Sequence, residues 1–158
     1  MMVSQEYVRL RGNLLKCTSE DINLMLNNDE QIYIAAFDVP IESLIEGNRT
    51  QTLGLVFGLN THIYFGNGGA VTDLEKDPKV MEAMQSLFIS APQVLDTMEL
   101  TEDYEYYDSN RIRAYLKTRR GVYYKELSSD KKEDSFLIML MNRVWDAILD
   151  ASEDGSHH

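Results

Sequence analysis

This chain is poor in cysteine and has no long apolar run, and each shortage excludes a class of protein. The 158 residues include a single cysteine, Cys17, so no internal disulfide can form, as is usual for proteins of a reducing compartment. The longest apolar run of the last predicted helix, residues 136–141, is far shorter than the roughly 20 residues that cross a membrane. No basic segment followed by an apolar one marks a secretory signal at the N-terminus. We therefore expect a cytoplasmic protein without a membrane segment.

Histidine is almost as scarce as cysteine. Two of the three histidines, His157 and His158, fall in residues 155–158, whose sequence GSHH is typical of a polyhistidine-tag remnant. His62 then stands as the only native imidazole. Because a zinc site needs several clustered nitrogen or sulfur ligands, the sequence predicts no metal site, and nothing in it calls for a cofactor.

Sequence motifs for catalysis are also missing. The chain has no G-x-S-x-G nucleophile elbow, and its glycine-rich residues 65–69, FGNGG, lack the Walker spacing and are typical of a hairpin turn. Nucleophilic catalysis would therefore depend on His62, oriented by a carboxylate such as Asp73 or Asp38. A small hydrolase centred on His62 is our second alternative, but we predict that the protein is not an enzyme.

The chain has enough apolar residues for one core. Hydrophobic residues make up 44% of it, which predicts a single domain over residues 1–154. The strand-like segments are residues 31–40, 50–59, 62–66, 110–118 and 121–127, and a further short strand is expected within 70–75. Helical periodicity marks residues 77–91 and 134–149, and a shorter helix is expected within 92–100. We predict an α+β fold, with an antiparallel sheet of about five or six strands, two long helices and one or two short ones packed on it.

The N-terminal quarter gives two further predictions. Residues 6–18 place apolar side chains at Val8, Leu10 and Leu14, an alternation that favours a strand or hairpin. Thr18 followed by Asp21 matches a capping box, in which each side chain accepts a hydrogen bond from the other residue's backbone. A short helix is therefore expected over residues 19–28.

Charge is distributed unevenly along the chain. The formal net charge is −11, yet the stretch from residue 111 to residue 125 contains six basic residues and no acid. In a strand every second side chain points to the same face, and we expect the face with the odd-numbered residues 111–117 to be exposed. It carries Arg111, Arg113, Tyr115 and Lys117. Interleaved cations and aromatic rings are typical of single-stranded nucleic-acid sites, so a nucleic-acid-binding protein that uses the basic-aromatic hairpin 110–127 is our first alternative.

Two observations argue against that alternative. Once those six positive charges are set aside, the rest of the chain carries −17, and such a field repels a polyanion. The neighbouring acidic residues 99–108, ELTEDYEYYD, can also pair with the cations across strands. Nucleic acid is therefore not the expected partner.

The preferred hypothesis is a non-catalytic protein-interaction module, such as an acidic inhibitor, immunity or regulatory protein of bacterial or phage type. An acidic surface speeds association with a basic partner, and tyrosines anchor interfaces, although they also suit a half-buried sheet. The predicted partner is another protein, and a homodimer is also open. The predicted partner-binding residues are Tyr104, Tyr106, Tyr107, Arg111, Arg113, Tyr115, Lys117 and Tyr123.

Overall fold

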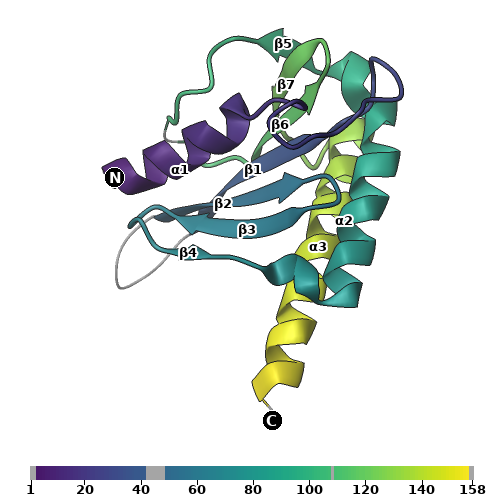
Figure 1. Ribbon diagram of the computed structural model, residues 1–158. Helices are drawn as coiled ribbons and strands as arrows, with labels where there is room; N and C mark the ends of the chain where they lie inside the picture. The colour runs from purple at the N-terminus through teal and green to yellow at the C-terminus, as the bar shows by residue number, and fades with distance from the viewer. Residues whose placement is uncertain (1–2, 42–48, 108, 157–158) are drawn as a thin grey trace.

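The described part of the chain folds around one seven-stranded antiparallel sheet in the order β4-β3-β2-β1-β6-β7-β5 (Figure 1). The computed structural model describes residues 3–41, 49–107 and 109–156. The strands are β1 (Ile34–Ile41), β2 (Arg49–Val56), β3 (Asn60–Phe65), β4 (Ala70–Val71), β5 (Glu99–Thr101), β6 (Arg113–Thr118) and β7 (Gly121–Glu126). The predicted α+β class and antiparallel sheet are confirmed. The strand count exceeds the prediction because the three-residue β5 was not expected.

Helices cover both faces of this sheet (Figure 1). One face carries α1 (Gln5–Lys16), and the opposite face carries α2 (Pro78–Ser90) and α3 (Lys132–Ser156). Two 3-10 helices, η1 (Leu74–Lys76) and η2 (Ala91–Thr97), flank α2. Each face therefore has its own apolar core. No helix among the described residues is long and apolar enough to cross a membrane.

The α2 helix begins as its sequence predicts. Asp77 caps it, because its side chain accepts hydrogen bonds from the backbone N–H groups of Lys79 and Val80, and Pro78 occupies the first turn. The buried side of α2 packs between the sheet and α3. That side consists of Val80, Met84, Leu87 and Phe88.

The α3 helix starts at Lys132, two residues before the predicted helical range of 134–149. The Asp134 carboxylate accepts a hydrogen bond from the backbone N–H of Ser128 at 2.9 Å and pairs with Lys125 Nζ at 2.7 Å. Trp145 is half-buried and packs against the core, whereas Leu149 is exposed. The apolar periodicity of residues 134–149 therefore extends to one exposed position, Leu149.

The first helix, α1, corrects our prediction of a strand or hairpin over residues 6–18. Ser4 caps the helix by accepting a hydrogen bond from the backbone N–H of Tyr7 at 3.1 Å. The buried positions recur at helical spacing, and they are Tyr7, Arg11, Leu14 and Leu15. Val8 is exposed, so the alternation through it was accidental. The helical period was hidden because one of its buried positions is an arginine.

Residues 19–28 form turns and bends, so the predicted short helix is wrong. The capping-box contacts do form: the Thr18 N–H donates to Asp21 Oδ2 at 2.9 Å, and the Asp21 N–H donates to Thr18 Oγ1 at 3.2 Å. Asn23 has a φ of 54°, and this left-handed conformation does not continue a right-handed helix. The motif thus predicted the local contacts but not the element.

Two strand ends differ from the prediction. We expected Pro40 to end its strand, but β1 continues to Ile41, and its pairing with β6 stops at Asp38. The missing N–H of Pro40 therefore costs no hydrogen bond on that side. The turn predicted at residues 60–61 lies at residues 57–59, where Gly58 has a φ of 69°.

Alternation along β1 determines what each face of the sheet contains. Ala35 and Phe37 belong to the core beneath α2 and α3, whereas Ile34 and Ala36 belong to the core beneath α1. By the same alternation, Asp38 points toward α1. A completely buried carboxylate therefore lies at the centre of the sheet on the α1 side.

Candidate functional site

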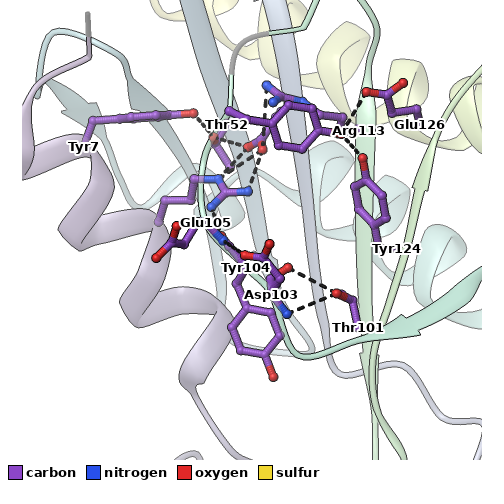
Figure 2. Close-up of polar contacts among 12 residues, drawn as sticks. Tyr7, Thr52, Thr101, Asp103, Tyr104, Glu105, Arg113, Tyr124 and Glu126 are labelled. Atoms are coloured by element: carbon purple, nitrogen blue, oxygen red, sulfur yellow. Dashed lines mark hydrogen bonds and ion pairs between the residues drawn. The ribbon is translucent and has the colours of Figure 1, made fainter.

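Asp38 is the centre of a buried polar cluster that α1 covers. Figure 2 labels Tyr7, Thr52 and Arg113 among the side chains of this cluster. Arg11 of α1 donates to both of its carboxylate oxygens, from Nε at 3.0 and 3.0 Å and from Nη2 to Oδ2 at 2.7 Å. Both side chains are almost completely buried. Such an ion pair is stable only because these charge-assisted hydrogen bonds replace the lost water.

A chain of hydroxyl groups continues the cluster into β2 and back to α1. The Thr52 hydroxyl donates to Asp38 Oδ1 at 2.7 Å, and its oxygen lies 2.6 Å from the Tyr7 hydroxyl. Burial, together with the nearby Asp38 carboxylate, raises the pKa of Tyr7 to about 12. Tyr7 therefore remains a neutral hydrogen-bonding group well above its ordinary titration range.

Arg113 brings a second buried guanidinium into the cluster from β6. Its Nη2 lies 3.9 Å from Asp38 Oδ2, and its carbon Cζ lies 5.0 Å and 4.5 Å from the ring centroids of Tyr106 and Tyr107. Both distances are within the range of a cation–π interaction. Two buried arginines thus face one buried aspartate.

A segment that we name the acidic strap, residues 102–107, closes the cluster at the edge of α1. Arg11 Nη1 donates to the carbonyl oxygen of Tyr104, and the rings of Tyr7 and Tyr106 meet edge to face at 5.5 Å. Asp103 holds the first turn of the strap by accepting from the Glu105 N–H at 3.0 Å. The strap thus rests on the tyrosine and arginine side chains of the cluster.

The outer side of the acidic strap is negatively charged. Glu102, Asp103 and Glu105 are exposed, whereas Tyr104 and Tyr106 are half-buried. This alternation follows from an extended chain with one side on the protein. The strap therefore presents carboxylates to solvent while its rings pack inward.

A second group of hydroxyls lies where the strap meets β7. The Tyr107 hydroxyl is hydrogen-bonded to that of Tyr124 and donates to Glu126 Oε1 at 2.8 Å. Burial and then the Glu126 carboxylate raise the pKa of Tyr124 to about 12. Ser109 also donates to Glu126 Oε1, at 3.3 Å. Glu126 is thus held by hydroxyl groups.

The predicted exposed face of the 110–127 hairpin is wrong. Arg113 and Tyr115 are buried against α1 and the strap, and only Arg111 is exposed. Lys117 is half-buried, and its Nζ donates to the carbonyl oxygens of Leu15 and Cys17 at 2.9 and 2.7 Å. The physical reason is that α1 covers a face that we took to be open.

The structure nevertheless brings most of the predicted residues together. Around the cluster lie Tyr104, Tyr106, Tyr107, Arg113 and Tyr115. Tyr123 does not join them, because it packs against the core on the opposite face of the sheet. Those five residues lie at one site, but most of them are buried or half-buried in it and do not form an exposed binding surface.

The remaining hairpin cations also pair within the chain, but with other acids than we expected. Arg119 pairs with Asp29 at 2.8 Å, and Arg120 lies 3.8 Å from Asp29 and 3.2 Å from Glu30. Within the described residues, no ion pair joins the hairpin to the strap carboxylates. The predicted pairing with residues 102–108 is therefore wrong for the described acids, and Asp108 lies outside the described residues.

By alternation with Ile63 and Tyr64, His62 lies on the α1 side of β3. Its ring centroid is 5.9 Å from that of Tyr64, and its Nδ1 is buried without a hydrogen-bond partner in the described part of the chain. Neither Asp38 nor Asp73 forms a hydrogen bond or ion pair with it among those residues. The same residues contain no group of three His, Cys, Asp or Glu side chains that could hold a metal ion. The geometry thus gives the hydrolase alternative no base oriented by a carboxylate.

Sequence reasoning missed the partners that organise this cluster. They are Tyr7, Arg11, Asp38 as the ion-pair partner of two arginines, Thr52 and Glu126. One signal was available: Asp38 interrupts an otherwise apolar run, IYIAAFDVP, and a carboxylate in a central strand needs a buried cationic partner. The sequence alone did not say that the partner was Arg11.

Comparisons with family models, with curated proteins and with solved structures found no match to this chain.

Proposed function

We propose that this protein is a non-catalytic interaction module whose acidic strap binds a basic surface of another protein. The observation that carries the proposal is that, at this cluster, the positive side chains are buried and the carboxylates of the strap are exposed. Arg11 and Arg113 are buried, whereas the strap carboxylates Glu102, Asp103 and Glu105 are exposed. Among the described residues, the buried charges of Arg11 and Arg113 are cancelled by those of Asp38 and Asp134, so the net charge of −11 is not hidden in the core and the strap contributes to an acidic surface.

The internal engagement of the cations supports a protein partner over a nucleic acid. Lys117 donates to two carbonyl oxygens, and Arg119 and Arg120 are paired with Asp29 and Glu30. Phosphate contacts would have to compete with these bonds inside a repelling field. A basic protein surface would instead be attracted, and complementary charge speeds its association.

The anchoring of the strap supports its use as a recognition surface. Its backbone is fixed by Arg11 through the carbonyl oxygen of Tyr104 and by the edge-to-face contact between Tyr106 and Tyr7. A surface that is already ordered loses less conformational entropy on binding. The carboxylates are thus presented in a fixed arrangement.

The test uses charge reversal on the strap with a matched control elsewhere. Glu102→Lys/Glu105→Lys changes the strap but keeps Asp103, whose carboxylate holds the turn. Glu82→Lys/Asp146→Lys makes the same change in charge at exposed positions of α2 and α3. Proteins captured from source cells by the wild type are then purified, and their binding to the wild type and to both variants is measured by calorimetry. We expect the strap variant to bind such a protein at least about tenfold more weakly, a difference of about 1.4 kcal/mol.

The proposal fails if each captured protein binds the two variants equally. Fluorescence anisotropy with labelled single-stranded RNA and DNA tests the nucleic-acid alternative, for which we expect a Kd weaker than about 10 μM at about 150 mM salt. Sub-micromolar binding that Arg111→Ala weakens would favour that alternative instead. A panel of hydrolase substrates tests the hydrolase alternative, and we expect His62→Ala to remove no activity that the wild type shows.

A further inference from the structure

Arg113 is a buried cation whose hydrogen bonds are not satisfied by the described residues. Its side chain is 1% exposed, and its Nε and Nη1 atoms are buried without a hydrogen-bond partner among those residues. Asp38, 3.9 Å from Nη2, already accepts three hydrogen bonds from Arg11 and one from Thr52. Leaving buried donors of a charged group unpaired is costly, so the site favours an added acceptor.

The other groups around Arg113 do not supply that acceptor. Tyr106 and Tyr107 contribute their rings, and Tyr115 lies beneath the neighbouring Arg11. Glu126 is the cross-strand neighbour of Arg113, but among the described residues it accepts hydrogen bonds from the hydroxyls of Tyr107 and Ser109. Within the described residues, Glu126 and Arg113 form no ion pair.

We propose that Arg113 is the anchor of a binding site for the carboxylate group of a ligand. A carboxylate is flat and can lie in the guanidinium plane, where the N–H groups point, while the Tyr106 ring stays in place against Arg113. A doubly charged phosphate would face stronger repulsion from Asp38 and Glu126. Arg11 and Arg113 share one carboxylate within ion-pair distance, that of Asp38, so a single added negative charge balances the site and two would exceed it.

Tyr107 provides the route to this site. Its ring lies 4.5 Å from the guanidinium carbon and is 40% exposed, so it reaches from Arg113 to the surface. Turning this one side chain outward uncovers Arg113 and frees the hydroxyl of Tyr124 as a second donor. The site needs no change in the sheet.

The direct test is a titration of wild-type protein followed through the Nε–H resonance of Arg113 by nuclear magnetic resonance. The probes are acetate, for a free small acid, and acetyl-Ala-Glu-Ala-amide, for the side chain of a protein, with chloride at equal ionic strength as control. We expect a saturable shift with one or both carboxylates and none with chloride. Tighter binding of the peptide identifies a protein side chain as the source, and tighter binding of acetate identifies a small molecule.

Thermal unfolding gives a second readout with matched variants. At ten times the Kd, a ligand that binds only the folded state should raise Tm by roughly 3–6 °C. Arg113→Met should lose this gain, whereas Arg111→Met, at the exposed position two residues away, should keep it. If Arg113→Met does not fold, the wild-type resonance still decides. The proposal is wrong, and Arg113 is purely structural, if its Nε–H resonance shows no difference between carboxylate and chloride. The same conclusion follows if Arg113→Met still gains Tm with the carboxylate.

Discussion

Replacing Asp38 with asparagine removes the carboxylate that two buried guanidinium groups share. The substitution keeps the shape of the side chain but deletes its charge, so Arg11 loses the charge-assisted character of its bonds to Asp38. Arg113 loses the carboxylate 3.9 Å from its Nη2. The expected result is a large loss of folding stability.

The size of that loss follows from how many charges are left unpaired. Removing one member of a buried ion pair typically costs about 3–5 kcal/mol. Asp38→Asn leaves two uncompensated guanidinium groups. Its loss of unfolding free energy should therefore lie near the upper end of this range, about 5 kcal/mol. Arg11→Met leaves the Asp38 carboxylate with Thr52 and with one cation, Arg113. Its loss of unfolding free energy should therefore lie near the lower end of the range, about 3 kcal/mol. The difference between these two variants is the sharper prediction.

Urea unfolding at neutral pH, followed by far-ultraviolet circular dichroism, measures both free energies. Asp29→Asn is the control, because it also removes a carboxylate beside two arginines, Arg119 and Arg120, but at the surface, where the expected cost is only about 0–1 kcal/mol. If Arg11→Met costs as much as Asp38→Asn, or if Asp38→Asn resembles the surface control, the two arginines do not depend on Asp38 and the reasoning fails.

Three other predictions test the packing around the cluster and the opposite core. Gly54→Ala would place a Cβ 2.7 Å from Leu14 Cδ2, so we expect it to lower the unfolding free energy by about 1–3 kcal/mol, measured in urea. Trp145→Ala should lower the unfolding free energy by about 3 kcal/mol in the same assay. This is the low end for a large core side chain, because the Trp145 ring is only half-buried. An unchanged Tm would contradict its contact with the core. The Tyr7 pKa of about 12 exceeds the unfolded value of about 10, so the folded protein keeps a proton that the unfolded chain loses, and stability should fall as pH rises from about 10 to 12. Tyr7→Phe should show a smaller fall in its urea midpoint over that range, and an unchanged fall would show that other groups cause it.

The sequence predicted those elements whose periodicity and caps agree. Apolar spacing and the Asp77 cap located α2, and alternating or β-branched runs located β1, β2, β3, β6 and β7. Strand β4, Ala70–Val71, lies within the short strand predicted at residues 70–75, whereas β5 has three residues, and so short a pairing arises from tertiary contact rather than from a local pattern. This is why the position of β5 at the sheet edge could not be predicted.

The α1 helix was missed because its buried face includes a charged residue. Tyr7, Leu14 and Leu15 fit a helical period only when Arg11 is counted with them. A pattern of apolar residues alone leaves a gap at that position, and a strand alternation then fits as well. A buried arginine is uncommon unless it is paired, and its partner, Asp38, is 27 residues away in the chain.

The same cause explains why the charged hairpin was placed on the surface. Alternation along β6 correctly separated Arg113, Tyr115 and Lys117 from Ala114 and Leu116, but alternation does not say which face is covered. Solvation of the charged face is the usual outcome in an antiparallel sheet. Here α1 covers that face, so the prediction of exposure was wrong although the division into faces was correct.

The buried charges connect the stability of the fold to the proposed recognition surface. A buried ion pair is weak support for stability, because apolar residues of similar volume often serve as well. Arg11, however, also donates to the carbonyl oxygen of Tyr104, and Arg113 lies against the rings of Tyr106 and Tyr107, so the two guanidinium groups fix the inner side of the acidic strap. An apolar replacement would fill the space without fixing that backbone. Holding the strap in place before binding reduces the entropy lost on association, which is a reason for this fold to bury two arginines around one aspartate.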